Sequence, residues 1–143
     1  MVAIQQHKKK HIYHCLNAIY ACFDDKKFDH ISYSRTLTEL GKLLKGVNFV
    51  NRKRWLEQYW AHNPRFLNAW YAKSKALFSS FNAQAFSNSI YALGQLGLEP
   101  STDWLVAWYS ASKSKLDTFK PQELSCVRAI GFETIYGLAG KLV

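Results

Sequence analysis

Leu67-Asn-Ala-Trp-Tyr-Ala-Lys-Ser-Lys, residues 67–75, returns 38 residues later as Leu105-Val-Ala-Trp-Tyr-Ser-Ala-Ser-Lys, residues 105–113. Extended to residues 66–87 and 104–125, this ungapped alignment holds nine identities in 22 positions. A fixed period of this length is typical of stacked helix pairs, because one pair cannot bury its apolar face alone. The repeat therefore predicts an all-α chain, built as a short right-handed α-solenoid of helix pairs.

The repeat extends toward the N-terminus. Residues 28–43 align with residues 81–96 at a shift of 53, which is 15 more than 38 and indicates an insertion about one helix long between Leu44 and Arg65. We thus expect a single helical-repeat domain over residues 1–143. Its predicted parts are a partial repeat (1–27), a repeat with an inserted helix (28–80), a second repeat (81–118) and a C-terminal partial repeat or cap (119–143).

Apolar residues recur at spacings of three and four along most of the chain, and nowhere do they alternate with period two. This pattern predicts helices over 11–23, 28–43, 51–60, 64–78, 82–97 and 102–118, with a last helix starting at Pro121. Asn82 is a predicted N-cap, Asn63 and Pro64 form a predicted helix start, and Gly97 is a predicted C-cap.

The composition limits the partners and the compartment. The 143 residues carry a formal charge of +9, which favours a polyanion, either nucleic acid or an anionic membrane surface. The chain contains three cysteines, an odd number that cannot all pair in disulfides. They indicate free thiols in a reducing compartment, the cytoplasm or an organelle matrix. No run of apolar residues is long enough to span a membrane. Residues 1–23 only weakly resemble an organelle transit segment.

Two predicted helices each carry a polar ridge on the side away from their apolar stripe. A solenoid stacks such ridges into one face, and amide, hydroxyl and guanidinium groups can hydrogen-bond base edges. The alternative is a merely solvated helix face. The ridge positions are Gln84, Asn88, Tyr91 and Gln95 in one helix, and Ile31, Arg35, Thr38 and Lys42 in the other.

A basic cluster lies in and around the predicted insertion. It comprises Lys45, Arg52, Lys53, Arg54 and Arg65, interleaved with Trp55, Tyr59 and Trp60. Cations beside aromatic rings suit phosphate contacts and base stacking in single-stranded nucleic acid. Alternatively, Trp55 and Tyr59 pack into the core and the cations only solubilise its rim.

Machinery for catalysis is not evident in the sequence. His7, His11, His14 and Cys15 fall at helical spacing, but the lysines between them argue against a zinc site. The chain contains no phosphate-binding glycine loop, nucleophile elbow or zinc-ligand spacing of cysteines. We expect no enzyme activity, no cofactor, no metal and no small-molecule substrate.

Phe81-Asn-Ala-Gln-Ala-Phe-Ser-Asn-Ser-Ile-Tyr-Ala-Leu-Gly-Gln-Leu-Gly, followed by Pro100-Ser-Thr-Asp-Trp-Leu and Phe119-Lys-Pro-Gln-Glu-Leu-Ser, resembles the octotricopeptide repeat family. That family is similar to the pentatricopeptide repeats: its helix pairs bind RNA in organelles, and related repeats occur in intracellular bacteria. The resemblance implies that the first helix of each pair, around Arg35 and Asn88, carries base-facing residues.

These observations predict a non-catalytic module that binds single-stranded RNA. The predicted base-reading residues are Arg35, Thr38, Lys42, Gln84, Asn88, Tyr91 and Gln95, and the predicted phosphate-binding residues are Arg52, Lys53 and Arg54. The main alternative is a protein interaction scaffold, such as an effector that an intracellular bacterium secretes into its host.

Overall fold

The computed structural model describes residues 2–115 and 118–121, and these contain helices and no strand. The prediction of an all-α chain is therefore confirmed for this part of the sequence. The α-helices are α1 (Val2–Cys22), α2 (His30–Leu43), α3 (Phe49–His62), α4 (Pro64–Ala76), α5 (Ala83–Gln95) and α6 (Thr102–Lys113), and a short 3₁₀ helix, η1 (Phe78–Ser80), precedes α5. Residues 122–143, which hold all but the first residue of the helix predicted from Pro121 and most of the predicted C-terminal cap, lie outside the described residues.

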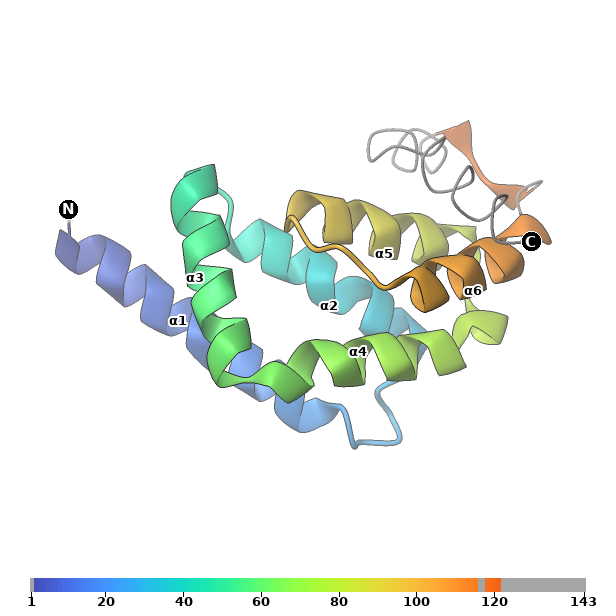
Figure 1. Cartoon of the computed structure of the whole chain (residues 1–143), viewed down its shortest axis with the longest axis horizontal. Coiled ribbons are helices and arrows are strands. Elements are labelled where there is room, and N and C mark those ends of the chain that lie inside the picture. Colours follow the sequence, from blue (N-terminus) through green and yellow to red (C-terminus); the bar gives the residue numbers. More distant parts are fainter. Residues whose placement is uncertain (1, 116–117, 122–143) are drawn as a thin grey trace.

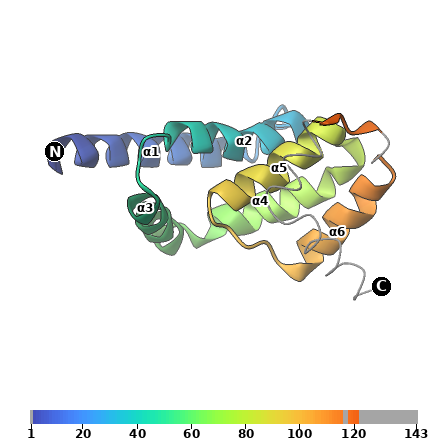
Figure 2. The same cartoon turned by 90° about the horizontal axis from the view of Figure 1, so that it is seen from above.

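Four helices form two layers (Figures 1 and 2). α2 and α5 lie side by side and run in the same direction, and α4 and α6 run the opposite way beside them. α1 and α3 occupy the other end of the molecule, at the left of Figure 1. α3 is the helix that the 15-residue excess predicted between Leu44 and Arg65.

Polar side chains fix where four of the helices begin. At each start an N-cap side-chain oxygen accepts the backbone N–H three residues further on, which satisfies a donor that the helix itself leaves unpaired. These N-caps are Asp29, Asn48, Ser101 and the predicted Asn82, whose Oδ1 lies 2.8 Å from the nitrogen of Ala85. Asn63 departs from the prediction, because its side chain makes no cap bond and instead donates to the carbonyl of Tyr59, 3.0 Å away. Pro64 does open α4 as predicted.

Gly97 terminates α5 in the way that the sequence predicted. Its φ of +68° is a conformation that residues with a Cβ rarely adopt. There the backbone N–H of Leu98 reaches back to the carbonyl of Leu93, 2.9 Å away, and that of Gly97 to the carbonyl of Gly94. This pair of bonds is a Schellman motif, which satisfies two of the last carbonyls of α5.

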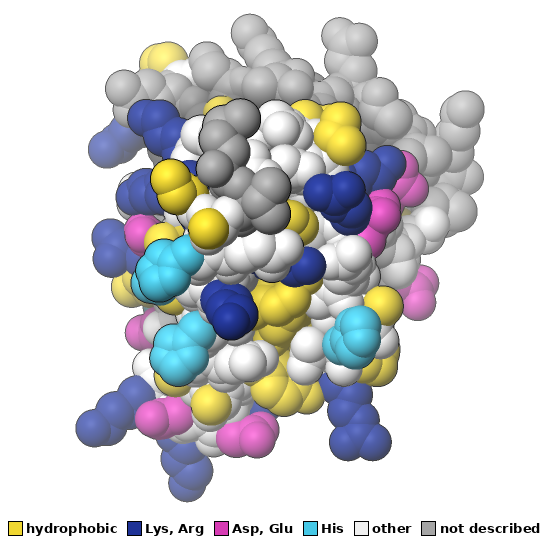
Figure 3. Space-filling view, turned by 90° about the vertical axis from the view of Figure 1, so that its left-hand side faces the viewer, with side chains coloured by type: hydrophobic (Ala, Val, Ile, Leu, Met, Phe, Trp, Pro, Cys, Tyr) yellow, Lys and Arg dark blue, Asp and Glu magenta, His cyan; other side chains and the backbone are white. Residues whose placement is uncertain are grey.

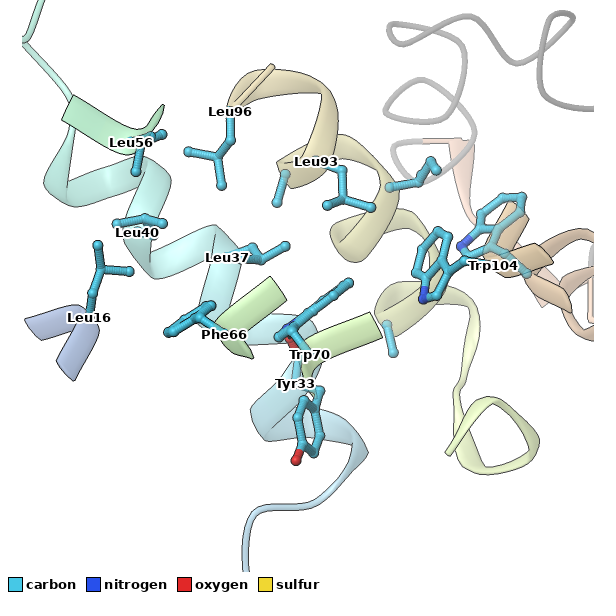
Figure 4. Packing of buried hydrophobic residues seen from close by; sticks show 14 of the residues in the cluster. Leu16, Tyr33, Leu37, Leu40, Leu56, Phe66, Trp70, Leu93, Leu96 and Trp104 are labelled. Atoms are coloured by element: carbon cyan, nitrogen blue, oxygen red, sulfur yellow. The ribbon is translucent and has the colours of Figure 1, made fainter. Parts of the chain in front are cut away.

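The core lies between the two layers and continues under α1 and α3 (Figure 4). Leucines from α1, α2, α3 and α5 meet the aromatic side chains of α4 and α6, and Phe66, Trp70 and Trp108 are completely buried. The indole N–H of Trp70 donates to the carbonyl of Tyr33 in α2, and that of Trp108 donates to the carbonyl of Phe86 in α5, at 3.2 Å in both cases. Tyr33 and Phe86 are 53 residues apart, which is the shift that aligns their helices.

Two helix boundaries differ clearly from the prediction. α1 begins at Val2 rather than near His11, and Lys8 and Lys9 in its polar first half donate hydrogen bonds to Lys45 and Gln58. α6 ends at Lys113 rather than near Thr118. Lys115 follows that end, and its ammonium group donates to the carbonyls of Ser79 and Phe81.

Candidate nucleic-acid interface

The eight ridge positions all lie outside the core. Helical spacing places them opposite the buried stripes of α2 and α5, which include Leu37 and Leu40 in one helix and Phe86, Ile90 and Leu93 in the other. The exposed positions are Ile31, Arg35, Lys42, Gln84 and Gln95, and the half-buried ones are Thr38, Asn88 and Tyr91. Their side chains therefore remain at least partly accessible to a ligand.

The two ridges lie on neighbouring helices, because α2 packs directly on α5. Gly41 faces Gln95 there: a Cβ built at position 41 would lie 3.3 Å from the side-chain oxygen Oε1 of Gln95. A larger residue at position 41 would displace that amide. The packing of α2 on α5 thus sets side by side two helices whose polar positions are 53 residues apart in the sequence.

Hydrogen bonds within the ridges leave donors and acceptors available. The amide of Gln95 donates to the hydroxyl of Tyr91, 2.8 Å away, and the hydroxyl of Thr38 donates to the carbonyl of Ser34. Lys42 forms an exposed ion pair with Glu39 at 3.1 Å. Exposed pairs of this kind contribute little stability and exchange readily for another anion.

Arg52 is placed differently from the other cations of the basic cluster. Its Nη2 lies 3.3 Å from the carbonyl oxygen of Leu44 and 3.4 Å from that of Val47, at the end of α2 and in the following loop. The guanidinium therefore ties α3 to the end of α2. This contact supports the architecture and leaves Arg52 less available to a phosphate than an exposed cation.

Lys53 and Arg54 are exposed on the first turns of α3. Nη2 of Arg54 lies 2.8 Å from Oδ1 of Asn51 on the same helix, which leaves its other N–H donors toward solvent. Lys45 is exposed in the neighbouring loop. Arg65 is also exposed, but it belongs to the start of α4, beside Tyr20 of α1.

Trp55 and Tyr59 of α3 belong to the core, which is the alternative left open by the sequence. Trp55 and Tyr59 are buried, and the hydroxyl of Tyr59 donates to Oδ1 of Asn17 on α1, 2.7 Å away. Burial raises the pKa of Tyr59 to about 12. In this arrangement these rings cannot stack on bases.

The structure places two further cations beside this cluster, which the sequence did not predict. Lys8 and Lys9 of α1 lie against it: Nζ of Lys8 is 3.2 Å from the carbonyl oxygen of Lys45, and Nζ of Lys9 is 2.8 Å from Oε1 of Gln58. The acid-free stretch of residues 1–10 was the available signal. The contact of Lys8 with Lys45 could not be predicted from local periodicity.

The described residues contain no group of three His, Cys, Asp or Glu side chains placed to hold a metal ion. His11 and Cys15 do approach each other, with Nε2 and Sγ 3.8 Å apart on α1. Within the same part of the chain, no helix combines the length and apolar character needed to cross a bilayer.

The arrangement can therefore offer hydrogen-bonding groups from α2 and α5 and positive charge from α1 and α3.

Comparison with known proteins found no matching family model, no matching curated protein and no matching solved structure.

Proposed function

We propose that this protein is a non-catalytic module that binds single-stranded RNA along the neighbouring ridges of α2 and α5. The observation that carries the proposal is the packing of α2 on α5, which sets side by side two helices that each carry solvent-accessible hydrogen-bonding side chains. Arg35, Thr38, Lys42, Gln84, Asn88, Tyr91 and Gln95 would face the bases there.

The proposal includes a repeat architecture. α2 and α4 form one helix pair and α5 and α6 the next, in a short right-handed α-solenoid with α3 inserted in the first pair. The indole bonds of Trp70 and Trp108, which reach aligned residues of α2 and α5, support this assignment. A fold of the octotricopeptide repeat type would use the first helix of each pair, here α2 and α5, for its ligand.

Phosphates would be held by the exposed cations near the end of α2. Lys53 and Arg54 suit this role, and Lys42 lies at the same end of α2. Arg52 would contribute to the positive potential while its guanidinium supports the loop carbonyls. A cation at a phosphate meets the same charge on every nucleotide, so these contacts supply affinity and the ridge supplies sequence preference.

The test is a selection from a random pool of single-stranded RNA by the full-length protein, followed by affinity measurements on the selected sequences. We expect binding that weakens with salt and a recognisable sequence preference. Asn88→Ala and Arg35→Ala should change which bases are preferred, since each removes a donor or acceptor pattern that differs between bases.

The control substitution is Lys26→Ala, in the exposed loop between α1 and α2. It should leave the base preference as it is in the wild type. If the wild-type protein does not bind the pool at low salt, the RNA proposal fails and the protein interaction scaffold becomes the better explanation.

A further inference from the structure

The first turns of α1 and α3 expose three large apolar side chains at one end of the molecule. Ile4 is 74% exposed, Phe49 64% and Val50 70%. Ile4 and the buried Val47 line one pocket of about 300 Å³ between the two helices. Val47 lies in the loop before α3, and Phe49 and Val50 are the first two residues of that helix. Single exposed apolar residues are common on proteins, whereas several at one end of a molecule can serve as an interaction surface. We call Ile4, Phe49 and Val50 the apolar tip.

Positive charge surrounds this tip. Residues 1–10 contain three lysines and residues 42–54 contain five Lys and Arg, so eight of the 19 cations of the chain fall in these two segments, which contain no Asp or Glu. Figure 3 views this end and shows dark blue Lys and Arg side chains near exposed yellow hydrophobic ones, with some magenta Asp and Glu and cyan His side chains on the same face. An apolar surface set among cations favours a partner with a negative and a nonpolar layer.

The spacing of the two kinds of side chain is the same in both helices. Lys8 follows Ile4 by four residues, and Lys53 and Arg54 follow Phe49 and Val50 by four. Four residues are about one helical turn, so each cation lies on the same face as its apolar neighbour and roughly 5 to 6 Å further along the axis. Both helices thus present apolar groups first and cations one turn behind.

We propose that this end of the molecule is a peripheral binding surface for an anionic lipid bilayer. The apolar tip enters the boundary between headgroups and acyl chains, and Lys8, Lys53 and Arg54 lie at the level of the lipid phosphates. Burial of apolar side chains and attraction to anionic lipid are the two contributions that hold interfacial protein segments on membranes.

The shape of this end favours a bilayer over a folded protein. The tip is carried by two helix ends that point outward and diverge, as Figures 1 and 2 show. A specific protein interface needs a complementary patch of roughly 1,200 Å² or more in total, which two diverging ends provide poorly. A fluid headgroup layer adapts to both ends, and its phosphates match the charge without a fixed geometry.

Vesicle flotation tests the proposal with the full-length protein. We expect it to float with phosphatidylcholine vesicles that contain phosphatidylserine, and to stay behind with phosphatidylcholine alone. The double variant Phe49→Ser/Val50→Ser should lower the partition coefficient by about tenfold or more, because it removes two penetrating side chains. Lys53→Glu/Arg54→Glu should lower it by at least about fivefold for each charge and reduce its salt dependence.

Two controls keep these results specific. Ile31→Ser removes an apolar residue that is 48% exposed and occupies the second position of α2, as Val50 does in α3. Lys26→Glu/Lys27→Glu reverses two exposed charges in the loop after α1. Both should float almost as the wild type does, and circular dichroism should show the same helix content for all variants.

Three results would overturn the proposal: no flotation of the wild type with anionic vesicles, equal flotation with neutral ones, or unchanged flotation of Phe49→Ser/Val50→Ser. A concentration-dependent dimer that this double variant abolishes would assign the tip to a second copy of the chain instead. The proposal does not depend on RNA binding, and Phe49→Ser/Val50→Ser is expected to leave RNA affinity close to that of the wild type.

Discussion

Trp70 and Trp108 show how one residue type can tie two helices together. Each indole is fully buried and donates to a backbone carbonyl of the helix packed beside it, so each contributes apolar burial and one hydrogen bond. Replacing either by Phe removes the donor and leaves unfilled volume. We expect Trp70→Phe and Trp108→Phe to lower the free energy of unfolding by about 1 to 3 kcal/mol each. Urea denaturation would measure this, and a neutral effect at one site with a large effect at the other would show that the two environments differ.

Tyr71 gives a residue-scale prediction about alkaline pH. Burial raises the pKa of its hydroxyl to about 12, whereas an unfolded tyrosine has a pKa near 10. Between these values the unfolded chain loses the proton first, so the stability that is present below pH 10 decreases as the pH rises toward 12. Tyr71→Phe removes the titrating group and keeps the ring. Its melting temperature should therefore fall less than that of the wild type between pH 9 and pH 11, and an equal fall would contradict the shift.

At the scale of one helix, the end of α5 separates two glycines with different roles. Gly97 has a positive φ, so Gly97→Ala should cost about 1 kcal/mol or more of unfolding free energy. Gly94 lies within α5 and is exposed, so Gly94→Ala should be neutral or stabilise by up to about 1 kcal/mol through better helix propensity. Thermal unfolding of both variants checks the contrast. Equal effects would mean that the αL conformation of residue 97 does not control where the helix ends.

At the scale of the whole molecule, the distribution of cations predicts how RNA binding responds to salt. Lys53→Glu/Arg54→Glu removes two exposed cations near the proposed RNA surface, and each lost phosphate contact should lower the slope of log affinity against log salt by roughly 0.7. Sequence preference should persist, because phosphates are alike on every nucleotide. Fluorescence anisotropy at several salt concentrations measures the slope.

Lys26→Glu/Lys27→Glu makes the same change of charge in the loop between α1 and α2. This matched variant should keep the slope of the wild type if binding is local to the ridges. Equal losses in both double variants would indicate a response to net charge alone. Arg52 is left intact in this comparison. Its guanidinium contacts the carbonyls of Leu44 and Val47, so replacing Arg52 would lower the stability of the fold as well as the affinity for RNA.

Features that depend on neighbouring residues could be predicted from the amino-acid sequence. The spacing of apolar residues predicted an all-α chain, the excess of 15 residues predicted α3, and single residues marked the cap at Asn82 and the turn at Gly97. Helix periodicity and capping involve residues within one or two turns of each other, so they remain legible in a linear sequence.

Which polar and aromatic side chains are available to a ligand depends on how the helices pack, and could not be predicted from the sequence. Arg52 differs from its neighbours Lys53 and Arg54 because it meets loop carbonyls, and Trp55 and Tyr59 face the core although they are interleaved with cations. Lys8 joins the basic cluster through a contact with a residue 37 positions away. Burial and charge pairing depend on which helices pack together, and that arrangement follows from the whole core rather than from any local pattern.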